Sequence, residues 1–364
     1  MRVLASAYPG EVRVAVVNGD ELVDYAIWRP GAPDGVGDLH RGRVTARVPA
    51  MAGAFVAIEG GDDGFLPDSA GGASASIGTL LAVRVTRAAQ GGKGPRLTAL
   101  LEAPVGSGDF GLVRRGPDAV RRLAALHPEA FVSVDDPTLY AALRTDFGDR
   151  LALVTLAFDD AIEAAVEALG ETTAALPGGA RMTVYPTPAL TAIDVDLGSA
   201  TADRSAKNRA QMMGNRALLP ALARQIRLCN LSGAILVDLA GLSAKKRGAL
   251  GPDFMAALAP DPLHPRFLGF TALGLAEIVR ARVHPPLHEL LGTPHAVGLA
   301  ALRRLSGEIA ARPGLAPVMR AAPAVVTALE ADIIARTDLA RRAGRPLMLR
   351  EDRGLAPLGW SIEQ

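Results

Sequence analysis

Residues 190–198 read LTAIDVDLG, and residues 233–241 read GAILVDLAG. Each stretch is a short apolar run with aspartate at its end, a pattern that indicates a strand. Alternate side chains of an extended strand share one face. Asp194 and Asp196 should therefore project together from the first strand, while the apolar residues between them pack inward. Asp238 should end the second strand.

The sequence between these two strands predicts a helix. Residues 215–230 read NRALLPALARQIRLCN, which could return the chain to pair a second parallel strand. Asp238 would then lie beside Asp194 and Asp196 at the edge where open α/β sheets usually place their sites. Clustered carboxylates repel one another unless a cation lies between them, and Mg²⁺ is the usual one. The alternative is that they are simply polar strand ends.

Length and composition indicate an ordered protein of two or three domains. The chain has 364 residues, of which 49% are hydrophobic and 21% charged. No apolar run of ~18 residues and no signal-type block appears, so we expect neither export nor membrane insertion. The single cysteine, Cys229, cannot form an internal disulfide or a multi-cysteine zinc site. We therefore expect a cytoplasmic protein.

The charge is unevenly distributed, although the net charge is only +1. Residues 201–250 hold nine Lys or Arg against two acids, an excess of seven around the proposed metal site. Such a field suits a phosphate backbone. Solvated helix faces would explain it equally well.

Residues 36–100 predict a small β-barrel such as an OB-fold, because several short strand-like runs are separated by glycine turns. Phe55 and Phe65 flank the turn Gly-Gly-Asp-Asp-Gly. They could stack on unpaired bases or could belong to the barrel core. Four basic residues lie at or near strand ends, where a nucleic-acid groove would need them: Arg41, Arg43, Lys93 and Arg96.

The remaining segments predict mixed α/β structure. Residues 12–17 and 22–28 read as strands, and residues 110–171 alternate between helix-like and strand-like runs. An alanine- and arginine-rich C-terminal region predicts two or three helices and a final strand-like piece at 346–349.

Three stretches together resemble the ribonuclease E/G family. Residues 37–67 (GDLHRGRVTARVPAMAGAFVAIEGGDDGFLP) are similar to its S1 domain, an OB-type fold. Residues 190–241 resemble its catalytic core, and residues 269–282 (GFTALGLAEIVRAR) resemble the segment that follows. All three occur in the family's order.

The resemblance implies a multidomain α/β architecture. An S1 OB-fold barrel would be inserted in an RNase H-like subdomain, followed by a DNase I-like catalytic subdomain and a small C-terminal α/β domain. The corresponding boundaries are 1–35 and 104–180 for the RNase H-like part, 36–103 for the S1 domain, 181–290 for the catalytic part and 296–364 for the small domain.

The resemblance also implies a Mg²⁺-dependent endoribonuclease that cleaves single-stranded RNA and leaves a 5′-phosphate on the downstream product. Asp194 and Asp238 would hold the metal. Asp196, where the family commonly has Asn, would be the third catalytic residue. The expected RNA contacts are Phe55, Phe65, Lys93, Arg96, Arg41, Arg43, Asn215 and Arg266.

Several departures from the family pattern carry their own expectations. The second acid of the family's Asp-x-x-Asp is Gly241 here, and residues 104–110 are too short to hold its 5′-monophosphate sensor. The Cys-x-x-Cys zinc link is missing, so we expect no zinc, and any homo-oligomer would form through the C-terminal domain. The alternative function is an RNA-binding relative that has lost catalysis. Gly241 favours that alternative, whereas the retained aspartates favour the enzyme.

Overall fold

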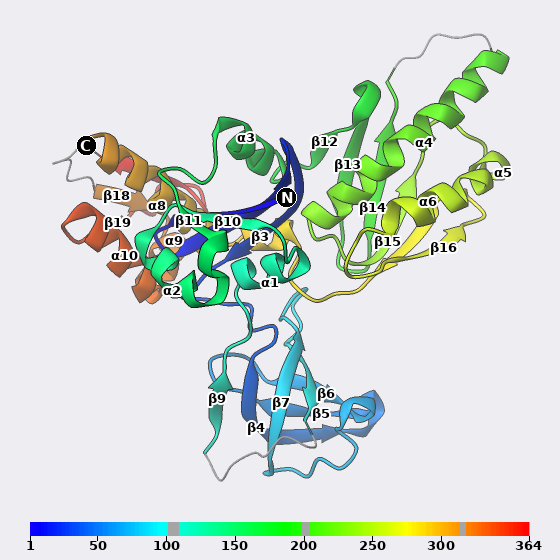
Figure 1. Ribbon diagram of the computed structural model, residues 1–364. Coiled ribbons are helices and arrows are strands. Elements are labelled where there is room, and N and C mark those ends of the chain that lie inside the picture. The colour runs from blue at the N-terminus through cyan, green and yellow to red at the C-terminus, as the bar shows by residue number, and fades with distance from the viewer. Residues whose placement is uncertain (101–108, 199–203, 313–317, 364) are drawn as a thin grey trace. The chain divides into compact units, whose positions relative to one another are not determined.

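The computed structural model describes residues 1–100, 109–198, 204–312 and 318–363 of the chain (Figure 1). Contacts divide the protein into two compact units. The first contains Met1–Pro33, Asp118–Val166 and His288–Gln364, and the second contains Asp34–Pro117 and Glu167–Leu287. The architecture is mixed α/β with several domains, as the sequence predicts.

The first unit contains a five-stranded sheet with the strand order β11-β10-β1-β2-β3. The strands β1, β2 and β3 are antiparallel neighbours, while β10 and β11 run parallel to β1. Asp118 and Asp136 cap helices by accepting hydrogen bonds from backbone N–H groups. The elements are β1 (Arg2–Tyr8), β2 (Glu11–Asn18), β3 (Glu21–Trp28), α1 (Ala119–Leu126), β10 (Phe131–Val134), α2 (Pro137–Phe147), β11 (Leu151–Leu153) and α3 (Asp160–Ala168).

The C-terminal part of this unit packs three helices against a small sheet with the order β19-β18-β20. Its helices and strands are α7 (Leu287–Leu291), which begins at the unit boundary, α8 (Pro294–Ala311), β18 (Val318–Ala321), α9 (Pro323–Ala331), α10 (Ile333–Ala343), β19 (Met348–Glu351) and β20 (Trp360–Glu363).

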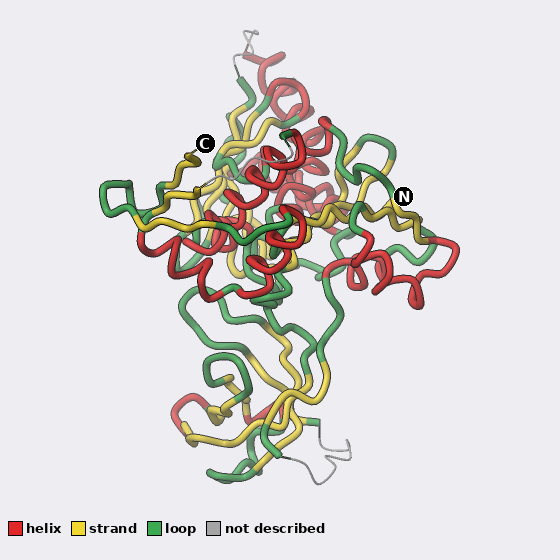
Figure 2. The backbone as a smooth tube through the Cα atoms, turned by 90° about the vertical axis from the view of Figure 1, so that its left-hand side faces the viewer, coloured by secondary structure: helices red, strands yellow, loops and turns green. Residues whose placement is uncertain are grey.

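The second unit contains a closed five-stranded barrel. In Figure 2 the barrel consists of strands connected by loops, and some of these loops contain a short helical turn. The pairings run from β4 through β5, β6, β8 and β7 back to β4, and β9 adds to β4. Val44, Val56, Leu66 and Leu97 fill the interior. The strands are β4 (Leu39–Val48), β5 (Gly53–Ala57), β6 (Gly64–Pro67), β7 (Leu80–Arg87), β8 (Arg96–Ala99) and β9 (Gly111–Arg114).

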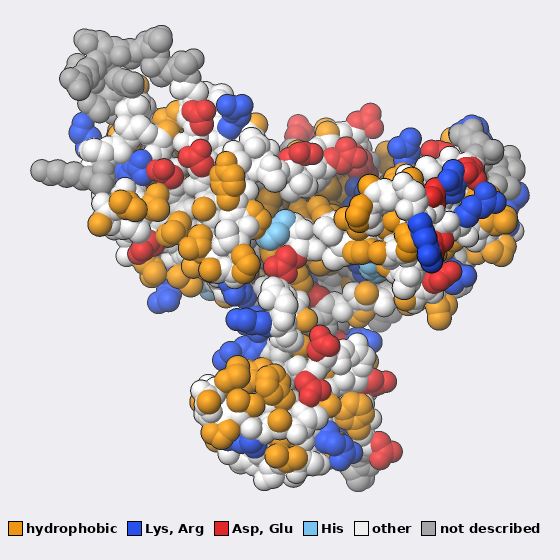
Figure 3. All heavy atoms as spheres, turned by 180° about the vertical axis from the view of Figure 1, so that it is seen from behind, with side chains coloured by type: hydrophobic (Ala, Val, Ile, Leu, Met, Phe, Trp, Pro, Cys, Tyr) orange, Lys and Arg blue, Asp and Glu red, His pale blue; other side chains and the backbone are white. Residues whose placement is uncertain are grey.

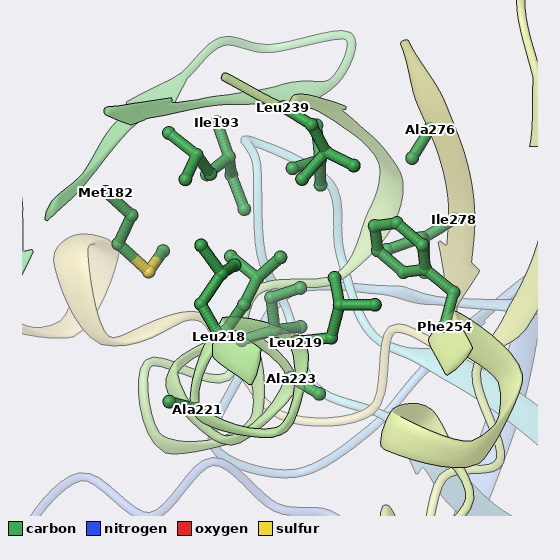
Figure 4. Close-up of a cluster of buried hydrophobic side chains, with 14 of the residues drawn as sticks. Met182, Ile193, Leu218, Leu219, Ala221, Ala223, Leu239, Phe254, Ala276 and Ile278 are labelled. Atoms are coloured by element: carbon green, nitrogen blue, oxygen red, sulfur yellow. The ribbon is translucent and has the colours of Figure 1, made fainter. Parts of the chain in front are cut away.

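The same unit contains a six-stranded sheet with the order β12-β13-β14-β15-β17-β16. Helices α4 and α6 cover one face, and Figure 4 shows Leu218, Leu219 and Phe254 pointing from these helices toward Ile193 and Ile278 of the sheet. The elements are β12 (Thr173–Ala175), β13 (Arg181–Pro186), β14 (Thr191–Asp196), α4 (Arg204–Leu228), β15 (Gly233–Asp238), α5 (Ala244–Arg247), α6 (Gly251–Leu258), β16 (Arg266–Phe270) and β17 (Ala276–Arg280).

The predicted helix between the two aspartate strands is confirmed and begins earlier, at Arg204. Several strands, among them β1 and β6, were not predicted from the sequence. β1 is buried on both faces and shows no alternation, and β6 has four residues directly after a glycine turn. Within the stretch 110–171, which the sequence predicts to alternate between helices and strands, β11 has only three residues and ends at Leu153. Within the described residues, no helix has the length and apolar character needed to span a membrane.

Candidate active site and RNA-binding face

Asp194 and Asp238 lie side by side on neighbouring parallel strands. β14 pairs with β15 in a register that places Asp194 opposite Asp238. Both side chains are exposed, whereas the adjacent Ile193 and Val237 are buried under α4. The two carboxylates therefore project from the same open face of the sheet, with strands separated by about 4.8 Å. Figure 3 shows the molecule from behind, with charged and hydrophobic side chains both exposed on that side.

The two carboxylates differ in their partners. Oδ1 of Asp238 accepts a hydrogen bond of 2.7 Å from Nη1 of Arg247. The Arg247 side chain is only 10% exposed, and that of Asp238 is 52% exposed. Asp194 has no hydrogen-bond or ion-pair partner among the residues that the structure describes. Within the described part of the chain, an arginine thus compensates the negative charge of Asp238 but not that of Asp194.

Asp196 shares the open face but has its own surroundings. Its Oδ1 accepts a hydrogen bond of 2.8 Å from the backbone N–H of Gly198, and its Oδ2 lies 3.5 Å from Nη2 of Arg181. It is two residues beyond Asp194, about 6.6 Å along the strand. Across the described part of the chain, no three His, Cys, Asp or Glu side chains come close enough to hold a metal together. The structure brings Asp194 and Asp238 together and leaves Asp196 beside Arg181.

This pair fits Mg²⁺ in its donor chemistry. Mg²⁺ prefers oxygen ligands and usually takes one or two carboxylates, with water and substrate phosphate completing its shell. Asp194 offers an exposed carboxylate that has no partner among the described residues, and Asp238 offers Oδ2. Because the second carboxylate lies in register with the first, their mutual repulsion favours a cation between them.

Asn215 is a correction to the predicted RNA contacts. Its side chain is fully buried on α4, and its Nδ2 donates to the carbonyls of Gln211 (2.7 Å) and Ala240 (3.0 Å). A buried amide cannot contact RNA directly. It instead ties α4 to the loop that follows Asp238, so its place is structural support of the site.

Arg266 lies away from the two aspartates. Its register partner on β17 is Val279, which in turn faces Ala234 on β15. Ala234 precedes Asp238 by four residues, or about 13 Å along the strand. The exposed Arg266 side chain therefore lies at the other end of the open face and does not join the carboxylate pair.

The structure describes only part of the basic stretch 201–250, because residues 201–203 lie outside the described residues and the side chains of 204–209 and 244–245 are not described. Arg216 forms an ion pair with Asp253 at 2.9 Å. Arg247 is buried beside Asp238. These two described arginines are paired with acids and do not form a free basic surface.

The barrel presents Phe55 and Phe65 on its outer surface. Ala54, Val56 and Leu66 alternate with them and fill the core, to which neither phenylalanine belongs. The two rings face each other across β5 and β6, with centroids 5.7 Å apart at an interplanar angle of 65°. The alternation of the strands therefore excludes the barrel-core alternative.

A basic residue lies next to the two phenylalanine rings, on the following strand of the barrel. Arg96 on β8 is the register partner of Phe65, and its side chain is exposed. Burial and the neighbouring Arg96 lower the pKa of Arg87. Two rings and a guanidinium thus lie on three adjacent strands, an arrangement that can stack on unpaired bases.

The other predicted basic contacts lie elsewhere on the barrel. Arg41 is half-buried, and its Nε has no hydrogen-bond partner within the described chain. Arg43 is exposed and donates to the carbonyl of Gly78 at 3.2 Å. Lys93 is exposed in the tight turn that pairs it with Gln90. All three remain predictions as RNA contacts.

Three histidines near the position of the family's zinc link, and Cys229, each have their own surroundings. His284 contacts Asp34 (2.5 Å), and His295 contacts Asp332 (2.8 Å). Burial lowers the pKa of His288 and raises the pKa of the Cys229 thiol to about 11. The shortened sensor stretch at 104–110 lies mostly outside the described residues.

Sequence reasoning missed two residues of the site. Arg247 entered only as part of a basic run, and Arg181 was not singled out. Arg247 follows Asp238 by nine residues, a spacing with no strand or helix periodicity. Arg181 faces Asp196 through antiparallel register, which only strand pairing reveals.

Comparisons with known proteins agree on one family. The model of the "Ribonuclease E/G family" matches residues 142–283, which contain both aspartate strands. Ribonuclease E of a Nostoc strain is 35% identical over 136 residues, covering 36% of this chain and 20% of that protein. Ribonuclease E of a Synechocystis strain is 37% identical over 137 residues, with the same coverage.

A longer match extends beyond this segment. Ribonuclease E of Escherichia coli is 23% identical over 387 aligned residues, covering 77% of this chain and 36% of that protein. The matched chain therefore spans between a fifth and about a third of the length of these relatives. Through residues 142–283, this chain is similar to the ribonuclease E/G family.

Proposed function

We propose that this protein is a Mg²⁺-dependent endoribonuclease that cleaves single-stranded RNA and leaves a 5′-phosphate on the downstream fragment. The observation that carries the proposal is the in-register pair of exposed carboxylates, Asp194 and Asp238, inside the segment that the family model matches. Relatives named ribonuclease E support RNA as the substrate.

In this proposal Asp194 and Asp238 hold the cation. Bound Mg²⁺ would offset negative charge that develops on the scissile phosphate and would make water more acidic. Asp196 is the candidate to accept a hydrogen bond from the attacking water and orient it. Arg181, 3.5 Å from Asp196, offsets the extra negative charge that this aspartate brings compared with the family's usual Asn.

The barrel would bind the RNA strand as an S1-type OB-fold domain. The outward pair Phe55 and Phe65, with Arg96 beside them, supports this role because stacking on aromatic rings is tolerant of base identity. By the same resemblance, we propose an RNase H-like subdomain for the five-stranded sheet, whose order is β11-β10-β1-β2-β3, and a DNase I-like subdomain for the six-stranded sheet.

The first test is cleavage of an unstructured, end-labelled RNA by the purified protein. We expect internal cleavage with Mg²⁺, none with excess chelator, and none by Asp194→Asn. Downstream products should be substrates for a 5′-monophosphate-dependent exonuclease. Cleavage that persists in the chelator, or in Asp194→Asn at the parental rate, would place the activity elsewhere.

The second candidate is an RNA-binding protein without catalysis, and Gly241 is the observation that favours it. This reading predicts that RNA binds through the barrel but stays intact with Mg²⁺ or Mn²⁺. Binding without cleavage under both metals would select it over the enzyme.

A further inference from the structure

Arg247 organises the end of strand β15. Its guanidinium makes four hydrogen bonds: Nη1 donates to Oδ1 of Asp238 and to the carbonyl of Gly274, Nε to the carbonyl of Leu242, and Nη2 to that of Leu239. The side chain is buried. Since a planar guanidinium has donors in fixed directions, it defines both the loop path and the Asp238 carboxylate orientation.

The loop after Asp238 is held by side chains throughout. Arg247 bonds the carbonyls of Leu239 and Leu242, and Asn215 bonds the carbonyl of Ala240 between them. Buried backbone carbonyls need such partners. The loop therefore depends on two side chains from the helices on either side of it in the sequence, Asn215 of α4 and Arg247 at the end of α5.

Gly241 explains why this arrangement differs from the family's Asp-x-x-Asp. Its φ is +68°, which favours glycine, and a Cβ there would lie 2.1 Å from Nε2 of Gln211. An acidic side chain at this position would strain the backbone and displace Gln211. Where the family has a second acid near this aspartate, the present chain has a positively charged side chain, Arg247, bonded to Asp238.

We propose that Arg247 is a positioning residue that occupies Oδ1 of Asp238, presents only Oδ2 to the metal, and supplies the counter-charge that limits the site to one divalent cation. This inference rests on the proposed metal site at Asp194 and Asp238. With Arg247 present, the facing pair carries two negative charges against one fixed positive charge.

Arg280 provides a matched control in the same sheet. It is also buried and makes four hydrogen bonds, two to Asp261 and one each to Asn230 and the carbonyl of Leu231. It faces Gly233 at the opposite end of β15. Arg280→Met therefore removes an equivalent buried network without touching the carboxylate pair.

The experiment measures Mn²⁺ binding to the metal-free protein by electron paramagnetic resonance, together with kcat and KM for RNA at saturating Mn²⁺. Arg247→Met should bind Mn²⁺ about threefold or more tightly, because a positive charge near the cation is gone. Its kcat should fall by about 100-fold or more with little change in KM, since a misplaced ligand affects the reaction more than RNA binding.

Arg247→Lys separates charge from geometry. It keeps the positive charge, so Mn²⁺ affinity should stay at the parental value. A single ammonium cannot reproduce the planar fork, so kcat should fall between the parent and Arg247→Met. Circular dichroism and urea denaturation measure the folded fraction of each variant, and the Mn²⁺ affinities and kcat values are expressed per folded molecule.

The outcomes distinguish this inference from the proposed function. If Asp194→Asn and Asp238→Asn leave Mn²⁺ affinity unchanged, the metal site itself is wrong. If those variants lose Mn²⁺ but Arg247→Met matches Arg280→Met in affinity and kcat, Arg247 is structural only. Weaker Mn²⁺ binding by folded Arg247→Met would also overturn its role as a counter-charge.

Discussion

Asp194 and Asp238 occupy the same register position on neighbouring parallel strands, but only Asp238 is hydrogen-bonded to a buried arginine, Arg247. Two carboxylates at matching positions in the sheet therefore contribute differently to the stability of the fold. This difference gives a prediction that is independent of activity.

Removing the two carboxylates should affect stability unequally. Asp238→Ala leaves the Arg247 guanidinium buried without its anion and should reduce the free energy of unfolding by about 1–3 kcal/mol. Asp194→Ala removes an exposed charge that has no partner among the residues that the structure describes, so the change should be within about 0.5 kcal/mol. Urea denaturation of the metal-free protein measures both. Equal losses would show that the Asp238–Arg247 contact contributes little.

The barrel surface should bind RNA through its outward rings. Phe55→Leu or Phe65→Leu removes a stacking surface worth roughly 1–3 kcal/mol per base. Affinity for a single-stranded oligonucleotide should weaken by about tenfold, with little change in melting temperature because neither ring belongs to the core. Val56→Ala is the matched control inside the barrel, and it should lower the melting temperature more than it lowers affinity per folded molecule.

The shortened segment at 104–110 predicts that the cleavage rate does not depend on the chemical group at the RNA 5′ end. A 5′-monophosphate binds tightly where arginine and backbone donors converge on it, and the sequence offers no counterpart of the family's sensor. RNAs with a 5′-monophosphate and a 5′-hydroxyl should be cleaved at similar rates in single-turnover assays. A preference of about tenfold for the monophosphate would reveal another phosphate-binding residue.

Zinc should be dispensable for both assembly and activity. His284 and His295 are each paired with a different aspartate, and thiolate ligands beyond Cys229 do not exist in the sequence. Elemental analysis should find no stoichiometric zinc, and a zinc-selective chelator should change neither the mass in solution nor cleavage. Any dimer should instead depend on the C-terminal domain. Loss of dimerisation in His288→Ala together with bound zinc would contradict this prediction.

Cys229 should react slowly while the protein is folded. Burial raises its pKa to about 11, so at pH 8 the reactive thiolate is about 100-fold rarer than for a thiol with the ordinary value near 9. Because the folded pKa is the higher one, the rate should keep rising about tenfold per pH unit up to pH 11. Reaction with a disulfide reagent, with and without guanidinium, measures this. Equal rates in both conditions would show an exposed thiol.

The two aspartate strands were predictable because local rules determine them. Period-two alternation gives the face on which Asp194 projects, and a helix between two strands gives their parallel pairing. The same alternation, read on β5 and β6, could have placed Phe55 and Phe65 outside the barrel. The alternation alone did not decide between the two placements, because the sequence of a short strand does not show which of its two faces points into the barrel.

Long-range pairing decided the rest of the site. The strand register places Asp194 beside Asp238 and Arg181 beside Asp196. This register depends on the backbone hydrogen bonds between neighbouring strands, and the sequence of one strand alone does not determine it. The burial of Asn215 depends on α4 packing against the loop after β15. Arg247 reaches Asp238 only because residues 238–247 fold back, and its buried charge is stable there because four acceptors surround it. The sequence by itself determined which carboxylates reach the open face, and the tertiary structure decided which of them the protein neutralises.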